Sequence, residues 1–316
     1  MSHPALISVD WGTSTLRGSL LATDGTIIAR SAEGPGVQPK PADGFEPVLA
    51  ELTAAWRKDY GPLPVIMSGM IGSRQGWHEI PYLACPVTVS DLATHLHTID
   101  SAPIGRIHIV PGLVLAPSGQ PPEVMRGEET QIMGALAADP ALPGASARMF
   151  VLPGTHSKWV WTADGTIVKF ATYMTGEIFA ALRNHTILGR LMPDGPSMFD
   201  RSAFDRGVVA GAADGPPGAL LNRVFATRTL GLFDAIAPHG LESYLSGVLI
   251  GAELAAATGI DKHRAITIIG NSQLSQSYHT AARLLRIDAR LASPDCAARG
   301  HFAIAQNAGL LKATPP

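Results

Sequence analysis

The chain has 316 residues, 46% of them hydrophobic and 16% charged, a composition typical of a globular protein with a large core and of a length that usually forms two domains. Its formal net charge of −2 indicates no electrostatic attraction to nucleic acid or to an anionic membrane. No apolar run approaches the roughly 18 residues of a membrane-spanning helix, and the N-terminus lacks the features of a signal peptide. The two cysteines and eleven histidines show no metal-ligand spacing, so we expect no structural metal and a reducing, cytoplasmic location.

Near the N-terminus, the segment DWGTSTLRGSLLATDGTI predicts three consecutive strands joined by two turns. A buried strand ends at Asp10, a second strand at 16–22 follows the polar residues 12–15, and Asp24-Gly25 leads into a third strand. Such a turn directs backbone N–H groups and hydroxyls at one place, which suits a phosphate, and Asp10 is placed to hold a metal ion. Taken alone, the segment favours an ordinary hairpin with a polar turn.

The second half of the chain repeats this order. A strand at 148–153 precedes the polar turn 154–157, a strand at 158–161 follows, and an Asp-Gly turn leads into a third strand that ends near Met174. Both copies have Gly-Thr after a buried strand and close with Asp-Gly-Thr-Ile. A long internal repeat carries more weight than a single motif. We therefore expect two similar domains, each opening with a three-stranded antiparallel meander.

The Pro- and Ala-rich segment 139–147 is the expected domain boundary. It gives an N-terminal domain over residues 1–140 and a C-terminal domain over 141–316, with the option that the last helix packs back toward the first domain. Apolar periodicity predicts the remaining elements. Helices are expected at 47–58, 90–96, 178–188, 198–212, 219–232, 241–257, 276–285 and 297–311, and strands at 63–67, 107–113, 265–270 and 288–292.

Three further segments carry candidate functional residues. The Gly-rich loop 68–86 follows a buried strand and holds many polar and aromatic side chains, which favours a ligand site, although a surface connection could have the same composition. Glu128 and Glu129 stand where a helix begins, a position that the helix dipole favours for acids, so they could serve only as capping residues. The strand ending at Gly270 offers backbone amides to a nucleotide, as many strand–helix junctions do.

Together these segments resemble one known family. DWGTSTLRG, PGTHSKW and IIGNSQLSQSY occur in the order of the two phosphate loops and the adenosine loop of the sugar kinase, heat-shock ATPase and actin superfamily. Within it the chain is most similar, over almost its whole length, to the 2-dehydro-3-deoxygalactonokinase family, and MRGEETQ and PGTHSKW are the most specific segments. The resemblance implies an α/β fold of two ribonuclease-H-like domains with ATP in the cleft between them. It also implies a keto-deoxy sugar acid held mainly by the N-terminal domain and a nucleotide held by the C-terminal domain.

Residue roles follow from the resemblance, since phosphoryl transfer depends chiefly on positioning and on charge neutralisation. Asp10 is expected in the Mg²⁺ shell, directly or through water. The second phosphate loop of the superfamily often begins with Asp, and this chain has Pro153 there, so metal binding should rest more on Asp10. The residues expected at the phosphates are Gly12, Thr13, Ser14, Arg17, Gly154, Thr155, His156 and Lys158, and those expected near the adenosine are Gly270, Asn271, Ser272 and Leu274.

The general base is expected in the segment GEETQ. Related carbohydrate kinases carry it in a Gly-Asp segment just before the second phosphate loop, and this chain has glutamate in place of aspartate. The resemblance therefore implies Glu128 as the base, with Glu129 as the second candidate. A base helps mainly by accepting the hydroxyl proton as the O–P bond forms. Adjacent helical residues point about 100° apart, so the two side chains cannot face the site equally well.

The sugar acid is expected at the loop that follows the strand 63–67. Arg74 can pair with the carboxylate through two hydrogen bonds, Trp77 offers an apolar wall, and Ser73, Gln75 and Glu79 can read hydroxyls. Arg74 could instead be a solvated loop charge. Glu177 could line the same cleft or be only an acid at a helix N-terminus.

The resemblance thus implies a kinase that uses ATP and Mg²⁺ to convert 2-dehydro-3-deoxy-D-galactonate to its 6-phosphate in galactonate breakdown. The alternatives are the same chemistry on another keto-deoxy acid, such as the gluconate epimer, and a non-kinase member of the superfamily, an ATP-driven chaperone or sensor or a polyphosphate hydrolase. The loop with Arg74 and Trp77, and a base beside the phosphate site, favour the kinase. A third interpretation is a binding module with duplicated hairpins. The sequence does not define the substrate epimer, the oligomeric state or regulation.

Overall fold

The computed structural model describes residues 3–139, 147–195, 198–259, 265–270 and 273–311. The chain divides into two compact units. Unit 1 comprises Met1–Ala147, Val160–Phe170 and Ser293–Pro316, and unit 2 comprises Arg148–Trp159 and Ala171–Ala292. This division differs from the expected boundary at 140/141, because part of the second hairpin belongs with unit 1. The last helix also belongs with unit 1, as the sequence had left open. The roles expected of the two domains stay predictions.

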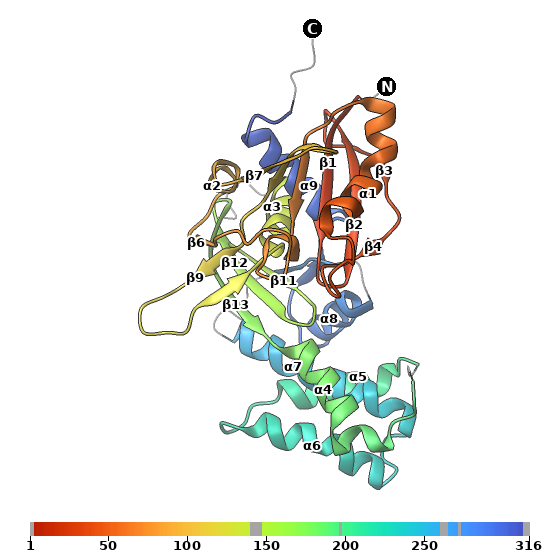
Figure 1. The fold of residues 1–316 in the computed structure, drawn as a ribbon. Helices are drawn as coiled ribbons and strands as arrows, with labels where there is room; N and C mark the ends of the chain where they lie inside the picture. Colours follow the sequence, from red (N-terminus) through yellow and green to blue (C-terminus); the bar gives the residue numbers. More distant parts are fainter. Residues whose placement is uncertain (1–2, 140–146, 196–197, 260–264, 271–272, 312–316) are drawn as a thin grey trace. The chain divides into compact units, whose positions relative to one another are not determined.

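Unit 1 contains a mixed sheet in the order β3-β2-β1-β5-β8-β7, with β4 (Gly34–Pro35) paired to β2. Figure 1 labels β1, β2, β3, β4 and β7 of this sheet. The first three strands form the expected antiparallel meander. Strands β1, β5 and β8 then run parallel to one another, and β7 is antiparallel to β8. The bounds are β1 (Pro4–Trp11), β2 (Thr15–Ala22), β3 (Ile27–Arg30), β5 (Val65–Ser68), β7 (His97–Ser101) and β8 (Gly105–Ile109).

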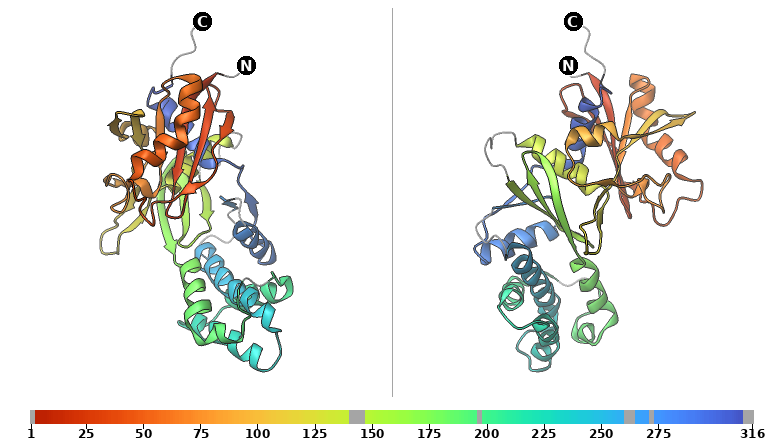
Figure 2. Two further views of the ribbon diagram at one scale, coloured as in Figure 1. Left: turned by 45° about the vertical axis from the view of Figure 1, so that its right-hand side comes forward. Right: turned by 90° about the vertical axis from the view of Figure 1, so that its left-hand side faces the viewer.

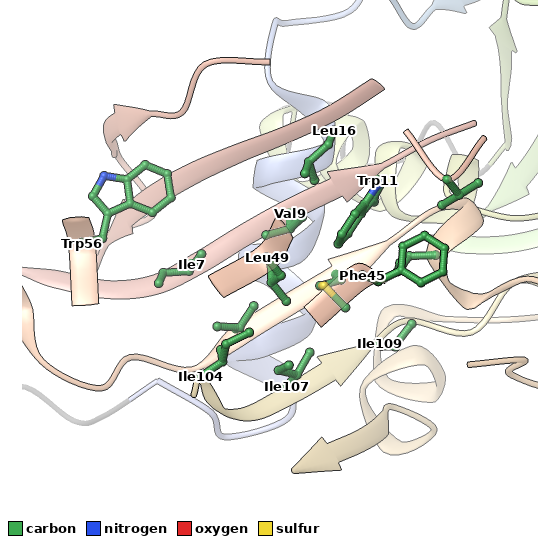
Figure 3. Packing of buried hydrophobic residues seen from close by; sticks show 14 of the residues in the cluster. Ile7, Val9, Trp11, Leu16, Phe45, Leu49, Trp56, Ile104, Ile107 and Ile109 are labelled. Atoms are coloured by element: carbon green, nitrogen blue, oxygen red, sulfur yellow. The ribbon is translucent and has the colours of Figure 1, made fainter. Parts of the chain in front are cut away.

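Helices cover both faces of this sheet, and successive side chains of β1 point to opposite faces. Ile7, Val9 and Trp11 share a core cluster with α1 (Phe45–Tyr60), shown in Figure 3. Ser8, on the other face, shares a 2.7 Å hydrogen bond with His301 of α9 (Cys296–Asn307). α3 (Glu128–Ala138) packs against α9. Unit 1 also has α2 (Val89–Thr94), the short helix η1 (Met70–Gly72) and a small sheet, β10-β9-β6, of Glu123–Met125, Leu113–Leu115 and Leu83–Ala84.

The second sheet repeats the strand order of the first. Its order is β13-β12-β11-β14-β15, which matches β3-β2-β1-β5-β8 strand for strand. β11, β14 and β15 run parallel to one another, as β1, β5 and β8 do. The two similar sheets that the repeat predicted are therefore confirmed, as is the ribonuclease-H-like fold that the resemblance implied. The bounds are β11 (Ala147–Leu152), β12 (Ser157–Ala163), β13 (Thr166–Tyr173), β14 (Ile266–Ile268) and β15 (Ala289–Leu291).

Unit 2 also holds a group of packed helices around α7 (Figure 2). Leu241, Tyr244 and Leu245 of α7 are buried in its core cluster. None of the helices in the described part of the chain combines the length and apolarity that a bilayer crossing needs. The bounds are α4 (Thr175–His185), η2 (Ile187–Leu191), α5 (Arg201–Ala212), α6 (Ala219–Leu232), α7 (Pro238–Thr258) and α8 (Gln273–Leu284).

Most predicted elements match the structure within a few residues, and α6 matches at both ends. Several short strands were not predicted: β4, β6, β7, β9 and β10. Each has only two to five residues, too few for a periodic signal. The Pro-rich segment 117–122 connects the two strands of the β9–β10 hairpin.

Candidate active site

Asp10 lies at the end of β1, where β1 is paired on both sides. Its neighbours across the sheet are Arg17 on β2 and Ser68 on β5. Burial raises the pKa of Asp10 to about 6; Arg17 acts to lower it, and Glu128 raises it further. Gly69 follows β5 with φ +97°, and a Cβ at this position would lie 2.7 Å from the Trp11 carbonyl oxygen and 3.5 Å from Asp10 Oδ1. Backbone thus comes very close to the Asp10 carboxyl.

The start of α3 packs against Gly69, next to Asp10. Gly127 precedes the helix with φ +106°, and a Cβ there would lie 3.0 Å from Gly69 Cα. Gly69 therefore stands between Gly127 and Asp10. This close packing brings Glu128 near enough to Asp10 for its negative charge to act on the pKa of that carboxyl. Two residues that the sequence singled out 118 positions apart are thus neighbours in unit 1.

The two glutamates differ in environment. Glu128 is half-buried, and its Oε2 accepts a 2.9 Å hydrogen bond from the backbone N–H of Arg126. Glu129 is fully buried; its Oε2 accepts from the Gly127 N–H at 2.7 Å, and its Oε1 accepts from Thr130 Oγ1 at 3.0 Å. Burial, with the charge of Glu128, raises the pKa of Glu129 to about 8. Glu129 is therefore mostly a neutral, interior carboxyl at pH 7.

Backbone hydrogen bonds and close packing fix the first polar turn, residues 12–15. The Gly12 N–H donates to the Thr15 carbonyl at 2.9 Å, and the Thr13 carbonyl accepts from the Gln38 N–H at 3.0 Å. A Cβ on Gly36 would lie 2.2 Å from the Thr13 carbonyl oxygen, so only glycine fits there. Thr13 and Ser14 are exposed. Within the described residues, their N–H groups donate no backbone hydrogen bond, which leaves them available to an anion.

Arg17 is exposed on β2. Its Nε donates to Glu33 Oε1 at 2.7 Å. The guanidinium that was expected to bind a phosphate therefore forms an ion pair with Glu33 in this structure.

The second polar turn, between β11 and β12, has the same kind of support. The Thr155 carbonyl accepts from the Glu177 N–H at 3.0 Å, and a Cβ on Gly176 would lie 2.4 Å from the Gly154 carbonyl oxygen. Thus the first turn of α4 lies directly against this loop. His156 Nε2 and Glu177 Oε2 are 2.6 Å apart, and both side chains are about half exposed. Glu177, expected at the sugar acid, is therefore paired with a residue expected at the phosphates.

Lys158 follows the second turn on β12 and is only 7% exposed. Its Nζ donates to Thr172 Oγ1 at 2.8 Å.

A buried carboxylate that was not expected from the sequence fixes the adjacent strand residues. Glu253 of α7 accepts hydrogen bonds at 2.7 Å from both Ser157 Oγ and Trp159 Nε1 and at 2.6 Å from the Tyr278 hydroxyl; Thr175 Oγ1 also donates to it. Its signal in the sequence is a single acid within an apolar helix, LSGVLIGAELAAA, because an unpartnered acid there would be costly.

The loop after β5 is well organised. The Trp77 N–H donates to the Ile71 carbonyl at 2.8 Å, and the Ile80 N–H donates to the Gly72 carbonyl at 2.9 Å. Trp77 is half-buried and packs against the core cluster of unit 1. Ser73 is buried and accepts a 3.3 Å hydrogen bond from the backbone N–H of Gln75. The side chains of the loop that face solvent include Arg74, Gln75 and Glu79.

The expected adenosine segment is only partly described. Gly270 follows β14 with φ +140°, and a Cβ there would lie 2.4 Å from Ser275 Oγ. Leu274 is half-buried in the first turn of α8. Asn271 and Ser272, also expected at the adenosine, lie outside the described residues.

Comparison with known proteins identifies the family. The family model of 2-keto-3-deoxy-galactonokinase matches residues 10–304. The chain belongs to this family. The 2-dehydro-3-deoxygalactonokinase of Escherichia coli (strain K12) is 34% identical over 292 residues, covering 92% of this chain and 94% of that protein. A Rhizobium meliloti (strain 1021) protein assigned the same activity is 34% identical over 302 residues, covering 95% and 96%.

A solved structure agrees with this assignment. The crystal structure of a Sinorhizobium meliloti protein, also assigned as a 2-dehydro-3-deoxygalactonokinase, aligns with a TM-score of 0.85 at 33% identity. It covers 95% of this chain and 98% of that chain. The family and the two-part sugar kinase fold expected from the sequence are therefore confirmed. The family's kinase activity implies the use of ATP.

Arg126 is a second residue that the sequence did not single out. It precedes Gly127 in the segment MRGEETQ and is 8% exposed. Its Nη2 donates to the Ile80 carbonyl at 2.7 Å, which joins the start of α3 to the loop after β5. An arginine beside two acids reads in the sequence as an ordinary exposed charge, so only the structure shows that it is buried.

Proposed function

We propose that this protein transfers the γ-phosphate of ATP to the 6-hydroxyl of 2-dehydro-3-deoxy-D-galactonate, a step of galactonate breakdown. The observation that carries the proposal is that Glu128, at the start of α3, lies close enough to Asp10 to raise the pKa of that carboxyl. The family model covers both residues. A carboxylate beside a phosphate-binding turn and a second carboxylate within its electrostatic reach are what phosphoryl transfer to a hydroxyl requires. The name of the Escherichia coli relative supplies the substrate.

Glu128 is the general base in this proposal. It is half-buried, adjacent to Asp10, and oriented by the Arg126 N–H. Such a carboxylate can accept the proton of the sugar hydroxyl as that oxygen bonds to phosphorus. Glu129 is a poorer candidate, because its carboxyl is fully buried and bonded to the backbone of its own helix turn.

The same pair of acids supports a role for Mg²⁺. Nucleotide-bound Mg²⁺ keeps several waters and takes only one or two protein carboxylates, so the lack of a larger ligand cluster among the described residues is consistent with it. Asp10 carries a raised pKa partly because of the negative charge of Glu128, and a cation beside Asp10 would relieve that repulsion. When bound, the metal would neutralise phosphate charge; Asp10 is the residue that would hold it.

The two polar turns and the segment after β14 are assigned to ATP. The exposed N–H groups of Thr13 and Ser14, with Gly12, would bind phosphate oxygens. Arg17 would do so only after leaving Glu33. The other residues assigned to the nucleotide are Gly154, Thr155, His156, Lys158, Gly270, Asn271, Ser272 and Leu274.

The sugar acid is assigned to the loop after β5, where Ser73, Arg74, Gln75, Trp77 and Glu79 lie. Glu177 is a weaker candidate, since it is paired with His156. We expect the protein to act in the cytoplasm, where ATP and the sugar acid are both available.

A coupled assay of ADP release tests the proposal. Wild-type protein is supplied with ATP and either of the two C4-epimeric keto-deoxy acids, with and without Mg²⁺. We expect ADP release that depends on both the galactonate-derived acid and Mg²⁺. The absence of acid-dependent ADP release with both epimers would refute the kinase, whereas preference for the gluconate-derived epimer would refute only the substrate.

A further inference from the structure

Arg126 carries a buried positive charge that the protein itself satisfies only in part. The guanidinium is always ionised and has five N–H donors. Its Nη2 donates to the Ile80 carbonyl, and its Cζ lies 4.3 Å from the centre of the Tyr82 ring. Nε and Nη1 are shielded from solvent and have no acceptor within the described residues. Three N–H groups are therefore unmatched.

The charge of Arg126 also lacks an acidic partner in the described part of the chain, where no carboxylate forms an ion pair with its guanidinium. Burying a cation without a counter-charge is costly, and a carbonyl and an aromatic face offset only part of that cost. An anion that binds from outside the chain would supply the missing counter-charge and hydrogen-bond acceptors.

The surroundings of Arg126 connect it to the candidate site. A Cβ on Gly72 would lie 3.1 Å from Nη1, so the guanidinium reaches the start of the loop that carries Ser73 and Arg74. On its other side, the Arg126 N–H donates to the carboxylate of Glu128 at 2.9 Å. One residue thus contacts both the loop assigned to the sugar acid and the proposed base.

We propose that Arg126, rather than Arg74, provides the positive charge that recognises the carboxylate of the sugar acid. The inference rests on the proposed function, since the anion it names is the substrate. Arg74 is exposed, and a solvated guanidinium contributes less to an ion pair than a desolvated one. The backbone N–H of Arg126 also hydrogen-bonds to the carboxylate of Glu128, so the proposed carboxylate-binding residue lies next to the proposed base.

The test compares the keto-deoxy acid with its uncharged C1 carboxamide, using Arg126→Met, Arg126→Lys and Arg74→Met, which tests the rival arginine. In Arg126→Met we expect KM for the acid to rise at least about tenfold, KM for ATP to change less than about twofold, and the preference for acid over amide to disappear. Arg126→Lys should retain part of that preference, and Arg74→Met nearly all of it. An unchanged preference in Arg126→Met, or its loss in Arg74→Met, would overturn the inference.

A measurement on the wild type keeps the test decisive if Arg126→Met does not fold. In protein labelled with [¹⁵N]arginine, the Nε signal of Arg126, assigned by its absence in Arg126→Lys, should shift when the acid binds and not when the amide binds. Equal shifts with both ligands would contradict the proposal. If the wild type phosphorylates neither epimer in the ADP assay, the proposed function has failed; if it does so and the Nε signal is indifferent to the acid, only the role of Arg126 has failed.

Discussion

Glu128 and Glu129 are adjacent in the chain but lie in different surroundings at the start of α3. Glu128 is half-buried beside Asp10, whereas Glu129 is fully enclosed and bonded to Gly127 and Thr130. The helix turns by about 100° per residue, so the side chain of Glu128 is partly exposed beside the candidate site and that of Glu129 lies in the interior. Replacing each glutamate by glutamine should therefore have different effects on kcat.

Glu128→Gln should lower kcat by about 100- to 10,000-fold, because the amide cannot accept the proton of the sugar hydroxyl. KM for ATP should stay nearly constant, since the change affects the reaction rather than nucleotide binding. Glu129→Gln is the matched control and should keep kcat within about threefold. Steady-state ADP release measures both; equal, small losses in the two variants would mean that neither glutamate is the base.

Glu129→Gln should also change how stability depends on pH. The pKa of Glu129 is about 8 in the folded protein and 4.5 is its ordinary value, so folding takes up a proton between these values. The stabilisation is complete below pH 4.5 and is lost as pH rises through 8. Glutamine stays uncharged, so the stability of the variant relative to wild type should rise by about 1 kcal/mol per pH unit from pH 5.5 to 7.5.

Urea unfolding at several pH values measures this effect. Glu51→Gln, at an exposed position of α1, is the control and should follow the wild-type profile. Parallel profiles for Glu129→Gln and wild type would show that Glu129 is ionised in the folded protein.

At the scale of elements, helices α5 and α7 pack backbone against backbone through four glycines. Gly207 and Gly211 on α5 face Gly247 and Gly251 on α7, each pair in a Gly-x-x-x-Gly spacing. A Cβ at Gly211 would lie 2.0 Å from the Val248 carbonyl oxygen. Small residues allow this approach, and it fixes the helix that carries Glu253 behind the second polar turn.

Gly211→Ala should therefore destabilise the protein by about 2–3 kcal/mol, because overpacking forces the two backbones apart. In an open helix the same change would stabilise by about 1 kcal/mol, so the sign itself is informative. Urea unfolding measures the effect. Val209→Ala, on the exposed face of the same helix, should change the free energy of unfolding by less than about 0.5 kcal/mol. A stable Gly211→Ala variant would contradict the close packing.

At the scale of the whole molecule, the C-terminal helix completes the unit that begins at the N-terminus. α9 packs on α3, where a Cβ at Gly300 would lie 1.9 Å from the Thr130 carbonyl oxygen, and it bonds to β1 through Ser8 and His301. The α3 helix in turn presents Glu128. The last segment of the chain therefore supports residues that its first 130 positions contribute.

A chain that ends at Ala292 should lose the fold of unit 1 while the helices of unit 2 persist. Hydrogen exchange should show β1 and β5 unprotected and α5 and α7 still protected, because the latter lie in a separate compact unit. A chain that ends at Leu311 retains α9 and is the control. Protection of β1 without α9 would show that the helix is not needed for the first sheet.

Most of the fold could be predicted because its signals are local and repeated. The two meanders follow from strand patterns joined by Asp-Gly turns, and the recurrence of that pattern along the chain indicates two similar sheets. The short strands β6, β7 and β9 could not be predicted, because a few residues carry no period. The placement of α9 was only an option from the sequence, since apolar residues show that a helix is buried but not against which partner.

The family, the duplicated topology and the segments that carry polar chemistry follow from the amino-acid sequence alone, because they reside in motifs read along the chain. Tertiary packing was needed to bring Asp10 next to Glu128, to bury Glu129, to enclose Arg126 without a counter-charge among the described residues and to place Glu253 behind Ser157. The physical reason is that burial and proximity belong to pairs of residues distant in sequence. The same glutamate is a base or a neutral interior group according to which neighbours remove it from water.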